Sequence, residues 1–212
     1  MMNLADVRRE YQKSGLRRSE LKEDPIEQLS LWLEQAAGLE LIDNTAMTLS
    51  TVDAEGQPSQ RVVLLKQLDQ EGLVFYTNLG SNKAKDIAVN NKVSAHFAWL
   101  PLERQVKIKG IATRISNTEA LKYFVSRPRN SQIAAWASNQ SQQISSRQML
   151  MSAFENMKQK FAEGEIPLPD FWGGYRIKAT SFEFWQGGGA RLHDRFVYSP
   201  SQSGWEIKRL AP

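Results

Sequence analysis

The sequence predicts an α+β fold in which an antiparallel sheet closes into a barrel with flanking helices. Short segments rich in valine, leucine, threonine and aromatic residues occupy residues 46–52, 61–67 and 73–77. Segments 53–56 and 69–72 separate them and resemble hairpin turns. Successive hairpins produce an antiparallel sheet, and six or more such strands tend to close into a barrel. The predicted helices occur in clusters, which argues against a doubly wound parallel sheet.

The first helix is predicted from the residues at its two ends. Asp24 suits the N-cap, Pro25 the first helical position, and Glu27 the third. Gly38 is a typical residue at which a helix stops. We therefore expect a helix from Pro25 to about Ala37.

The remaining elements follow from caps, turns and β-propensity. Ser81 is expected to cap a helix that ends near residue 90. Strands are expected over residues 93–99, 104–115, 175–185, 191–198 and 205–210. Helices are expected over residues 117–126, 131–137 and 145–162.

The composition is that of a globular protein that can bury a real core, with 212 residues, 41% of them hydrophobic and 24% charged. We expect residues 1–20 to form a basic, partly flexible arm and residues 21–212 to form one domain. No apolar segment approaches the roughly 18 residues of a membrane helix, and the N-terminus has no apolar signal core. A cytoplasmic protein without a membrane partner is expected.

Several classes of site are excluded by the residues that the chain lacks. It has no cysteine, so disulfides, thiolate nucleophiles and iron–sulfur clusters are excluded. Its two histidines, His96 and His193, are far apart in sequence, so no metal site is expected. Neither a G-x-G-x-x-G nor a Walker sequence is present. The net charge of +4 permits nucleic-acid binding, but small phosphorylated ligands explain it equally well.

Two segments in the first half carry cations that suit a phosphate. Segment 61–66 has a cation at each end, and strict alternation would place Arg61 and Lys66 on opposite faces of a strand. Ser81 and Lys83 lie at a predicted helix N-terminus, where free amides and the helix dipole attract phosphate. The spacing alone fits a simple serine cap equally well.

A third candidate anion site lies between two predicted helices. Tyr123 and Arg127 are four residues apart and share a helix face. Pro128 disfavours helix at Arg127, so Ser131 is expected to open the next helix with its amides free. A phenol, a guanidinium and a helix end would then converge on one anion. An ordinary helix–loop–helix also favours an arginine at this place, because the cation complements the helix dipole.

The most specific pattern is residues 183–195, Glu-Phe-Trp-Gln-Gly-Gly-Gly-Ala-Arg-Leu-His-Asp-Arg. In a continuous strand, Arg191, His193 and Arg195 would share one face suited to an anionic, planar ligand. A solvated cationic face is as compatible with alternation alone. The segment resembles the C-terminal signature of the pyridoxine (pyridoxamine) 5′-phosphate oxidases, an acidic-aromatic-Trp-Gln sequence followed after four residues by Arg-Leu-His-Asp-Arg.

This resemblance extends from Arg8 to Pro212 and implies a fold and a reaction. The implied fold is an FMN-binding split β-barrel, assembled as a homodimer with FMN at the subunit interface. The implied reaction is FMN-dependent oxidation of pyridoxamine or pyridoxine 5′-phosphate to pyridoxal 5′-phosphate, for vitamin B6 biosynthesis and salvage. Oxygen would accept the electrons and give hydrogen peroxide, and the amine would also release ammonia.

The resemblance also implies site residues, each by its matching position. Catalytic roles are implied for Arg191 and His193. Substrate contacts are implied for Arg8, Tyr11, Lys66, Tyr123, Arg127, Ser131, Arg191 and His193. FMN contacts are implied for Arg61, Val62, Val63, Leu64, Leu65, Lys66, Tyr76, Thr77, Lys83, Gln105, Gln140, Ser141, Trp185 and Arg195. Gln140 and Ser141 are expected from the second subunit, and the arm is expected to close over the site.

The chain departs from the resemblance at Asn82, where many members of the family carry arginine. One charge-assisted contact to FMN is therefore expected to be missing.

Two other functions remain compatible with the residues. Split barrels host several functions, so one alternative is a flavin or haem binder without oxidase activity. The substrate set argues against it, because a mere flavin binder has no need of those residues. The other alternative is a basic nucleic-acid-binding barrel, which would be colourless and bind DNA or RNA in a salt-sensitive way.

Overall fold

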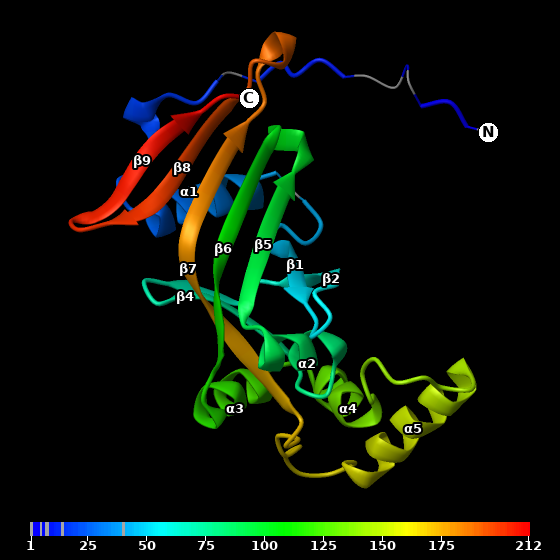
Figure 1. Cartoon of the computed structure of the whole chain (residues 1–212). Coiled ribbons are helices and arrows are strands. Elements are labelled where there is room, and N and C mark those ends of the chain that lie inside the picture. Colours follow the sequence, from blue (N-terminus) through cyan, green and yellow to red (C-terminus); the bar gives the residue numbers. More distant parts are fainter. Residues whose placement is uncertain (1, 5, 7–8, 14, 40) are drawn as a thin grey trace.

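The computed structural model describes residues 2–4, 6, 9–13, 15–39 and 41–212 (Figure 1). Its strands are β1 Ala46–Val52, β2 Pro58–Leu64, β3 Gln67–Asp69, β4 Gly72–Asn78, β5 Lys92–Trp99, β6 Arg104–Arg114, β7 Trp172–Gln186, β8 Asp194–Ser201 and β9 Gly204–Leu210. Its α-helices are α1 Pro25–Ala37, α2 Asn82–Val89, α3 Asn117–Ser126, α4 Arg129–Ala137 and α5 Arg147–Lys160. Its 3-10 turns are η1 Arg18–Glu20, η2 Leu100–Leu102 and η3 Gly189–Arg191.

The strands of this described part form one antiparallel sheet in the order β2-β1-β5-β6-β7-β4-β3, and β8 and β9 extend from β7. The two end strands, β2 and β3, follow one another in the chain through Leu65 and Lys66. The Lys66 amide donates to the Val74 carbonyl at 2.9 Å, which holds this connection against β4. The connecting chain, rather than a further ladder, therefore brings the edges of the curled sheet together, and the prediction of an antiparallel sheet is confirmed.

Strand β7 organises the molecule because it is 15 residues long. One edge of β7 pairs with β6 along nearly its whole length. The other edge pairs with β4 over residues 172–177 and with β8 over residues 182–186. The two ends of β7 therefore belong to different surroundings, with α3 and α4 near one end and η3 beyond the other (Figure 1).

Two apolar clusters hold these elements together. In the larger one, α1 buries Leu29 and Trp32, and the Trp32 ring lies 5.1 Å from the Phe184 ring. Burying one such large side chain stabilises the fold by about 1.5–3 kcal/mol. The smaller cluster joins Phe124 of α3 to Trp172 of β7, whose rings lie 5.1 Å apart. It fixes the helical end of the molecule to the sheet.

The predicted start and end of α1 are confirmed. Asp24 caps the helix through Oδ1, which accepts from the Ile26 amide at 2.6 Å and the Glu27 amide at 3.3 Å. The helix ends at Ala37, as expected, with Gly38 at its C-cap.

The predicted position of β2 was wrong by three residues. It runs from Pro58 to Leu64 rather than over residues 61–67, because the β1–β2 hairpin pairs Val52 with Pro58 and Ala46 with Leu64. Helix α4 also begins earlier than predicted, at Arg129. Ser131 therefore lies inside its first turn, where its amide donates to the Pro128 carbonyl at 2.8 Å.

The predicted strand 191–198 was wrong at its start. Ala190 and Arg191 have φ of 52° and 62°, so they form part of the turn η3, and β8 begins only at Asp194. The expectation that Arg191, His193 and Arg195 share one strand face is therefore wrong. Within the described part of residues 1–20, the helical segment is limited to Arg18–Glu20. Among the described residues, no helix has the length and apolar character to cross a membrane.

Candidate active site

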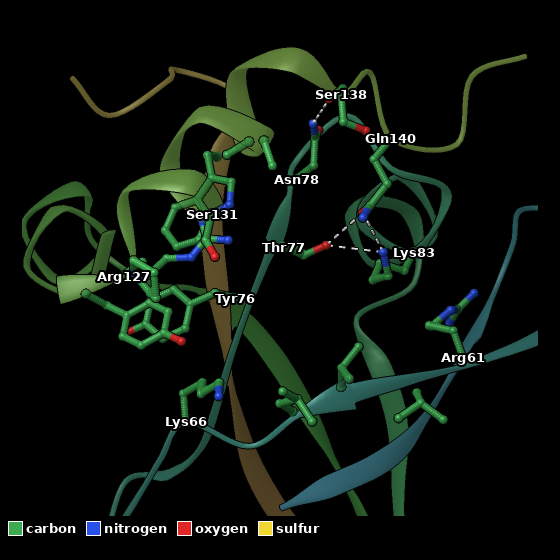
Figure 2. Close-up of a pocket in the computed structure, with 18 of the residues that line it drawn as sticks. Arg61, Lys66, Tyr76, Thr77, Asn78, Lys83, Arg127, Ser131, Ser138 and Gln140 are labelled. Carbon is green, nitrogen blue, oxygen red and sulfur yellow. Dashed lines mark hydrogen bonds between the residues drawn. The ribbon is translucent and has the colours of Figure 1, made fainter. Parts of the chain in front are cut away.

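A pocket of about 780 Å³ opens between β2, β4, α3 and α4 (Figure 2). It brings together many of the residues that the sequence singles out, although they come from β2, β4, α2, α3, α4 and the segments between elements. The predicted residues that line it are Arg61, Val62, Val63, Leu64, Lys66, Tyr76, Thr77, Lys83, Tyr123, Arg127, Ser131 and Gln140.

Lys83 forms a cationic centre at one end of this pocket. Its Nζ donates to Gln140 Oε1 at 2.8 Å and to the hydroxyls of Thr77 and Ser81, both at 3.2 Å. Burial, and then the nearby Arg61 charge, lower the pKa of Lys83 to about 8, although Asp86 acts in the opposite direction. Ser81 makes no side-chain cap bond to α2, because its hydroxyl faces Lys83. Since all three acceptors are neutral, an added anion would stabilise this buried ammonium group.

Arg61 and Lys66 line the same pocket, contrary to the expectation that they face opposite ways. Strand β2 ends at Leu64, so the alternation does not extend to Lys66. Leu65 is only 6% exposed and packs in the larger core. Arg61 donates to the Thr51 hydroxyl at 2.7 Å, and Asp86 lies 3.8 Å away. Burial lowers the pKa of Arg61, and the Asp86 charge partly offsets this effect.

An aromatic stack lies near the end of the pocket that is opposite Lys83. The rings of Tyr76 and Tyr123 are 4.0 Å apart, and the Trp172 ring lies 5.5 Å from Tyr76. Sequence reasoning missed Trp172. A possible signal was the pair of glycines that follows it, since a glycine inside a strand often marks a close approach. A Cβ on Gly174 would lie 3.0 Å from Tyr76 Cδ1 and 2.6 Å from the Phe75 carbonyl oxygen, so the packing beneath the stack requires glycine.

Arg127 is the second cationic centre, and it lies on the Trp172 ring with 4.9 Å between Cζ and the ring centroid. It is the C-cap of α3, just past the helix, and burial lowers its pKa. Among the described residues, its Nη1 is a buried side-chain nitrogen without a hydrogen-bond partner. Leaving such a donor unpaired costs about 1–3 kcal/mol or more. Lys66 and Ser131 line the same end of the pocket, so an anion there would meet several donors (Figure 2).

A second group of predicted residues surrounds the turn η3. The Trp185 and His193 rings are 4.6 Å apart, and the Tyr11 ring stands edge-on to both, at 5.5 Å and 5.3 Å respectively. The Gly188 amide donates to His193 Nδ1 at 3.2 Å, so the neutral imidazole carries its proton on Nε2. We call Tyr11, Trp185 and His193 the η3 group. Arg191 is exposed and lies in the turn η3 itself.

Arg195 and Gln105 are held by neighbours on the sheet. Glu183 Oε1 accepts from Arg195 Nε at 3.0 Å and Nη2 at 2.8 Å, and Glu183 also pairs with Lys107 at 2.6 Å. Burial alone would raise the pKa of Glu183, but the hydrogen bonds from Lys107 and Arg195 lower it below its usual value. Gln105 Oε1 lies 3.1 Å from His96 Nε2. The sequence analysis included Glu183 as the acidic residue of the signature but predicted no role for it.

Among the described residues of one chain, the pocket and the η3 group lie apart. Tyr76 in the pocket pairs with Gly174 of β7, whereas Trp185 lies eleven residues farther along the same strand. That separation is about 35 Å along the strand. Figure 1 shows the same arrangement, with helices α3 and α4 near one end of β7 and η3 beyond the other.

Three further expectations concern individual residues, and a fourth concerns metal ions. Gln140 was expected from a second subunit, but it lies in the pocket of its own chain, bonded to Lys83. Ser141 lies outside the pocket lining, and its hydroxyl accepts from the Asn82 amide at 3.3 Å. Arg8 lies outside the described residues. Within the described ranges, no three His, Cys, Asp or Glu side chains are grouped so as to hold a metal ion.

Two family models match successive parts of the chain. Residues 33–161 match the model described as pyridoxamine 5′-phosphate oxidase. Residues 172–212 match the model described as the pyridoxine 5′-phosphate oxidase C-terminal dimerisation region. The second match covers β7, β8 and β9 and therefore includes most of the η3 group.

Three relatives that match the chain along its full length have the same name. The pyridoxine/pyridoxamine 5′-phosphate oxidases of Vibrio vulnificus and Teredinibacter turnerae are 60% and 61% identical to the chain over 211 residues, and that of Shewanella baltica is 58% identical over 212 residues. In all three comparisons the match covers 100% of both chains.

Solved structures share the fold. PhzG from Burkholderia lata, in complex with tetrahydrophenazine-1-carboxylic acid, matches with a TM-score of 0.86 and 26% identity over 92% of this chain and 95% of that one. A pyridoxamine 5′-phosphate oxidase-related, FMN-binding protein from Nostoc punctiforme matches with a TM-score of 0.73 and 15% identity, covering 91% and 99%. The predicted split-barrel fold is thereby confirmed.

Proposed function

The chain belongs to the pyridoxine/pyridoxamine 5′-phosphate oxidase family, and from this premise we propose how its residues divide the work of the reaction. It is an oxidase of pyridoxine and pyridoxamine 5′-phosphate, as are the relatives that match it along their whole length. The observation that carries the proposal is the pair of separate cationic centres, Lys83 and Arg127, in one pocket. Two centres suit two phosphorylated molecules, a cofactor and a substrate.

The Lys83 centre is proposed to hold the phosphate of FMN. The buried ammonium group, the Thr77 hydroxyl and the N-terminus of α2 offer donors from one side of the pocket. Arg61 adds positive charge nearby. FMN held there would supply the two-electron acceptor for the hydride from C4′ of the substrate, and oxygen would take up these electrons with two protons to give hydrogen peroxide.

The Arg127 centre is proposed to hold the substrate 5′-phosphate. Its buried Nη1, which has no hydrogen-bond partner in the part of the chain that the structure describes, fits a phosphate oxygen, and Tyr123, Ser131 and Lys66 line the same end. Anchoring the phosphate fixes the distance from the pyridine ring to the rest of the pocket. Arg191 and His193 are proposed to hold that ring from its other side and to be the catalytic residues.

A second copy of the chain is proposed to complete each site. A dimerisation region over residues 172–212 suggests a homodimer. Tyr76 of β4 pairs with Gly174, which lies far from Trp185 along β7, so the η3 group of one chain would serve the pocket of its partner, with FMN at the interface. Two identical sites then follow from a two-fold axis.

The proposal has three further parts that rest on the sequence. Residues 21–212 form the FMN-binding split-barrel domain, and residues 1–20 form an arm that closes over the site. The location is cytoplasmic, and neither nucleic acid nor membrane is a partner. A flavin or haem binder without oxidase activity is disfavoured because it has no need of the Arg127 centre.

The visible spectrum of the purified protein tests cofactor and reaction together. We expect a flavin spectrum that bleaches when pyridoxamine 5′-phosphate is added without oxygen and that returns on exposure to air. A flavin spectrum that neither phosphorylated substrate changes would contradict the oxidase reaction. A protein that stays colourless and inert after FMN is added would contradict the cofactor.

The affinity for FMN is expected to fall as pH rises above the Lys83 pKa of about 8 in the free protein. A bound phosphate raises this pKa, so binding takes up a proton in that range, and Kd should rise by about tenfold per pH unit. Quenching of FMN fluorescence between about pH 7 and pH 9.5 measures Kd. The control is Lys83→Arg, whose charge persists. A flat profile in the unaltered protein, or an equal slope in the variant, would exclude Lys83 as the titrating group.

A further inference from the structure

Glu103 is a buried carboxylate whose donors come from the N-terminal arm. Its side chain is 2% exposed. Oε1 accepts from Arg9 Nη2 at 2.7 Å, and Oε2 accepts from the amides of Gln12 and Lys13 at 3.0 Å and 2.9 Å. These hydrogen bonds, above all the one from Lys13, lower the pKa of Glu103. Burying a carboxylate without such donors costs free energy, so the burial of Glu103 favours this position of the arm.

The backbone of Glu103 is tied to the glycine-rich segment before His193. Its carbonyl accepts from the Gly187 amide at 2.8 Å and from Gln186 Nε2 at 3.2 Å. Its φ of 54° is left-handed, which turns the chain between η2 and β6. One residue therefore joins the β5–β6 connection, the segment after β7 and the arm.

Tyr11 lies between the arm residues that Glu103 holds. A Cβ on Gly187 would be only 2.8 Å from Tyr11 Cδ1, so the phenol ring packs directly on that glycine. Its ring faces Trp185 and His193 edge-on. Farther along the arm, the Leu16 amide donates to Asp194 Oδ2 at 2.8 Å. Two carboxylates, Glu103 and Asp194, thus fasten the arm at successive points along the chain.

We propose that Glu103 is a positioning residue for the oxidase reaction, which holds Tyr11 against His193 and Trp185 by anchoring Arg9, Gln12 and Lys13. The inference rests on the proposed function, in which the η3 group covers the substrate ring. A fixed Tyr11 orders the His193 ring and excludes water from that side of the substrate. Glu103 itself acts only through the arm.

The test is Glu103→Gln, which keeps the size of the side chain and the backbone bonds. An amide has one acceptor oxygen, and its NH2 group would face the arm's donors. We expect faster hydrogen exchange at the Gln12 and Lys13 amides and a KM for pyridoxine 5′-phosphate raised about tenfold, the scale of one charge-assisted hydrogen bond. FMN affinity should not change. The matched control is Glu23→Gln, which removes an exposed ion pair with Arg18 and should alter none of these quantities.

Combining Glu103→Gln with Tyr11→Ala separates positioning from a general loss of stability. If Glu103 acts through Tyr11, the double variant should show the KM of Tyr11→Ala alone, because the two effects share one cause. The inference would be overturned if the two substitutions had multiplying effects on KM in the double variant. An unchanged KM in Glu103→Gln, or unchanged hydrogen exchange at the Gln12 and Lys13 amides, would overturn it as well. Failure of the proposed function would be seen in a separate experiment, the visible spectrum of the unaltered protein, if the substrate did not bleach the flavin.

Discussion

Replacing Arg127 with alanine is expected to raise the KM for pyridoxine 5′-phosphate about 100-fold. Losing one member of a buried charged pair costs about 2–5 kcal/mol, which corresponds to roughly 30-fold to 4000-fold in affinity. In this pocket the half-buried guanidinium lies on Trp172, and its buried Nη1 has no hydrogen-bond partner among the described residues. FMN should still bind, because Lys83 lies at the other end of the pocket. Steady-state kinetics and FMN titration measure the two effects.

Arg129→Ala is the matched control for this loss. Arg129 is two residues away, but it donates to the carbonyl oxygens of Phe161 and Gly164 and does not line the pocket. Its removal should leave KM within about twofold, as for a substitution away from the site. Equal losses in both variants would mean that the helical end has been disturbed as a whole. A normal KM in Arg127→Ala would remove Arg127 from the phosphate site.

Arg191→Ala is expected to lower kcat about 100-fold or more while the flavin spectrum is retained. This is the scale of loss for a group placed on the reacting part of a substrate. Leu192→Ala is the control, since Leu192 is the next residue and is 72% exposed. Unchanged turnover in Arg191→Ala would refute the catalytic assignment.

Mixing equal amounts of these two variants, at a substrate concentration low enough that each alone has little activity, tests whether the site is shared. In a random mixture of Arg127→Ala and Arg191→Ala chains, half of the dimers are mixed, and each mixed dimer has one site with both arginines. About a quarter of the normal activity should then return after the chains exchange. No recovery after verified exchange would place Arg127 and Arg191 in a site within one chain.

Elements set by neighbouring residues were predictable from the sequence. Asp24 and Pro25 act within one turn, and the bounds of α1 follow from them. The position of β2 depends instead on its pairing with β1, in which Pro58 opposes Val52. The start of β8 depends on the left-handed backbone at Ala190 and Arg191, which alternation of side chains does not reveal.

The residues of the site were easier to predict from the sequence than the way in which the fold brings them together. Tyr123, Arg127 and Ser131 lie close in sequence and line one pocket, although α4 starts before Ser131. That Trp185 lies at the far end of β7 from Tyr76 follows from strand order and length, which are long-range properties. Glu103 has its partners about ninety residues away in sequence, so local patterns could not have found it.

The length of β7 separates the pocket from the η3 group, so the activity in a cell depends on the concentration of the chain as well as on its sequence. If the pocket and the η3 group belong to different sites, an isolated chain holds two halves that never work together. Catalysis then exists only in the associated state, and the active fraction obeys mass action. At low expression, activity would fall faster than protein level, so a modest loss of abundance would have a disproportionate effect on vitamin supply.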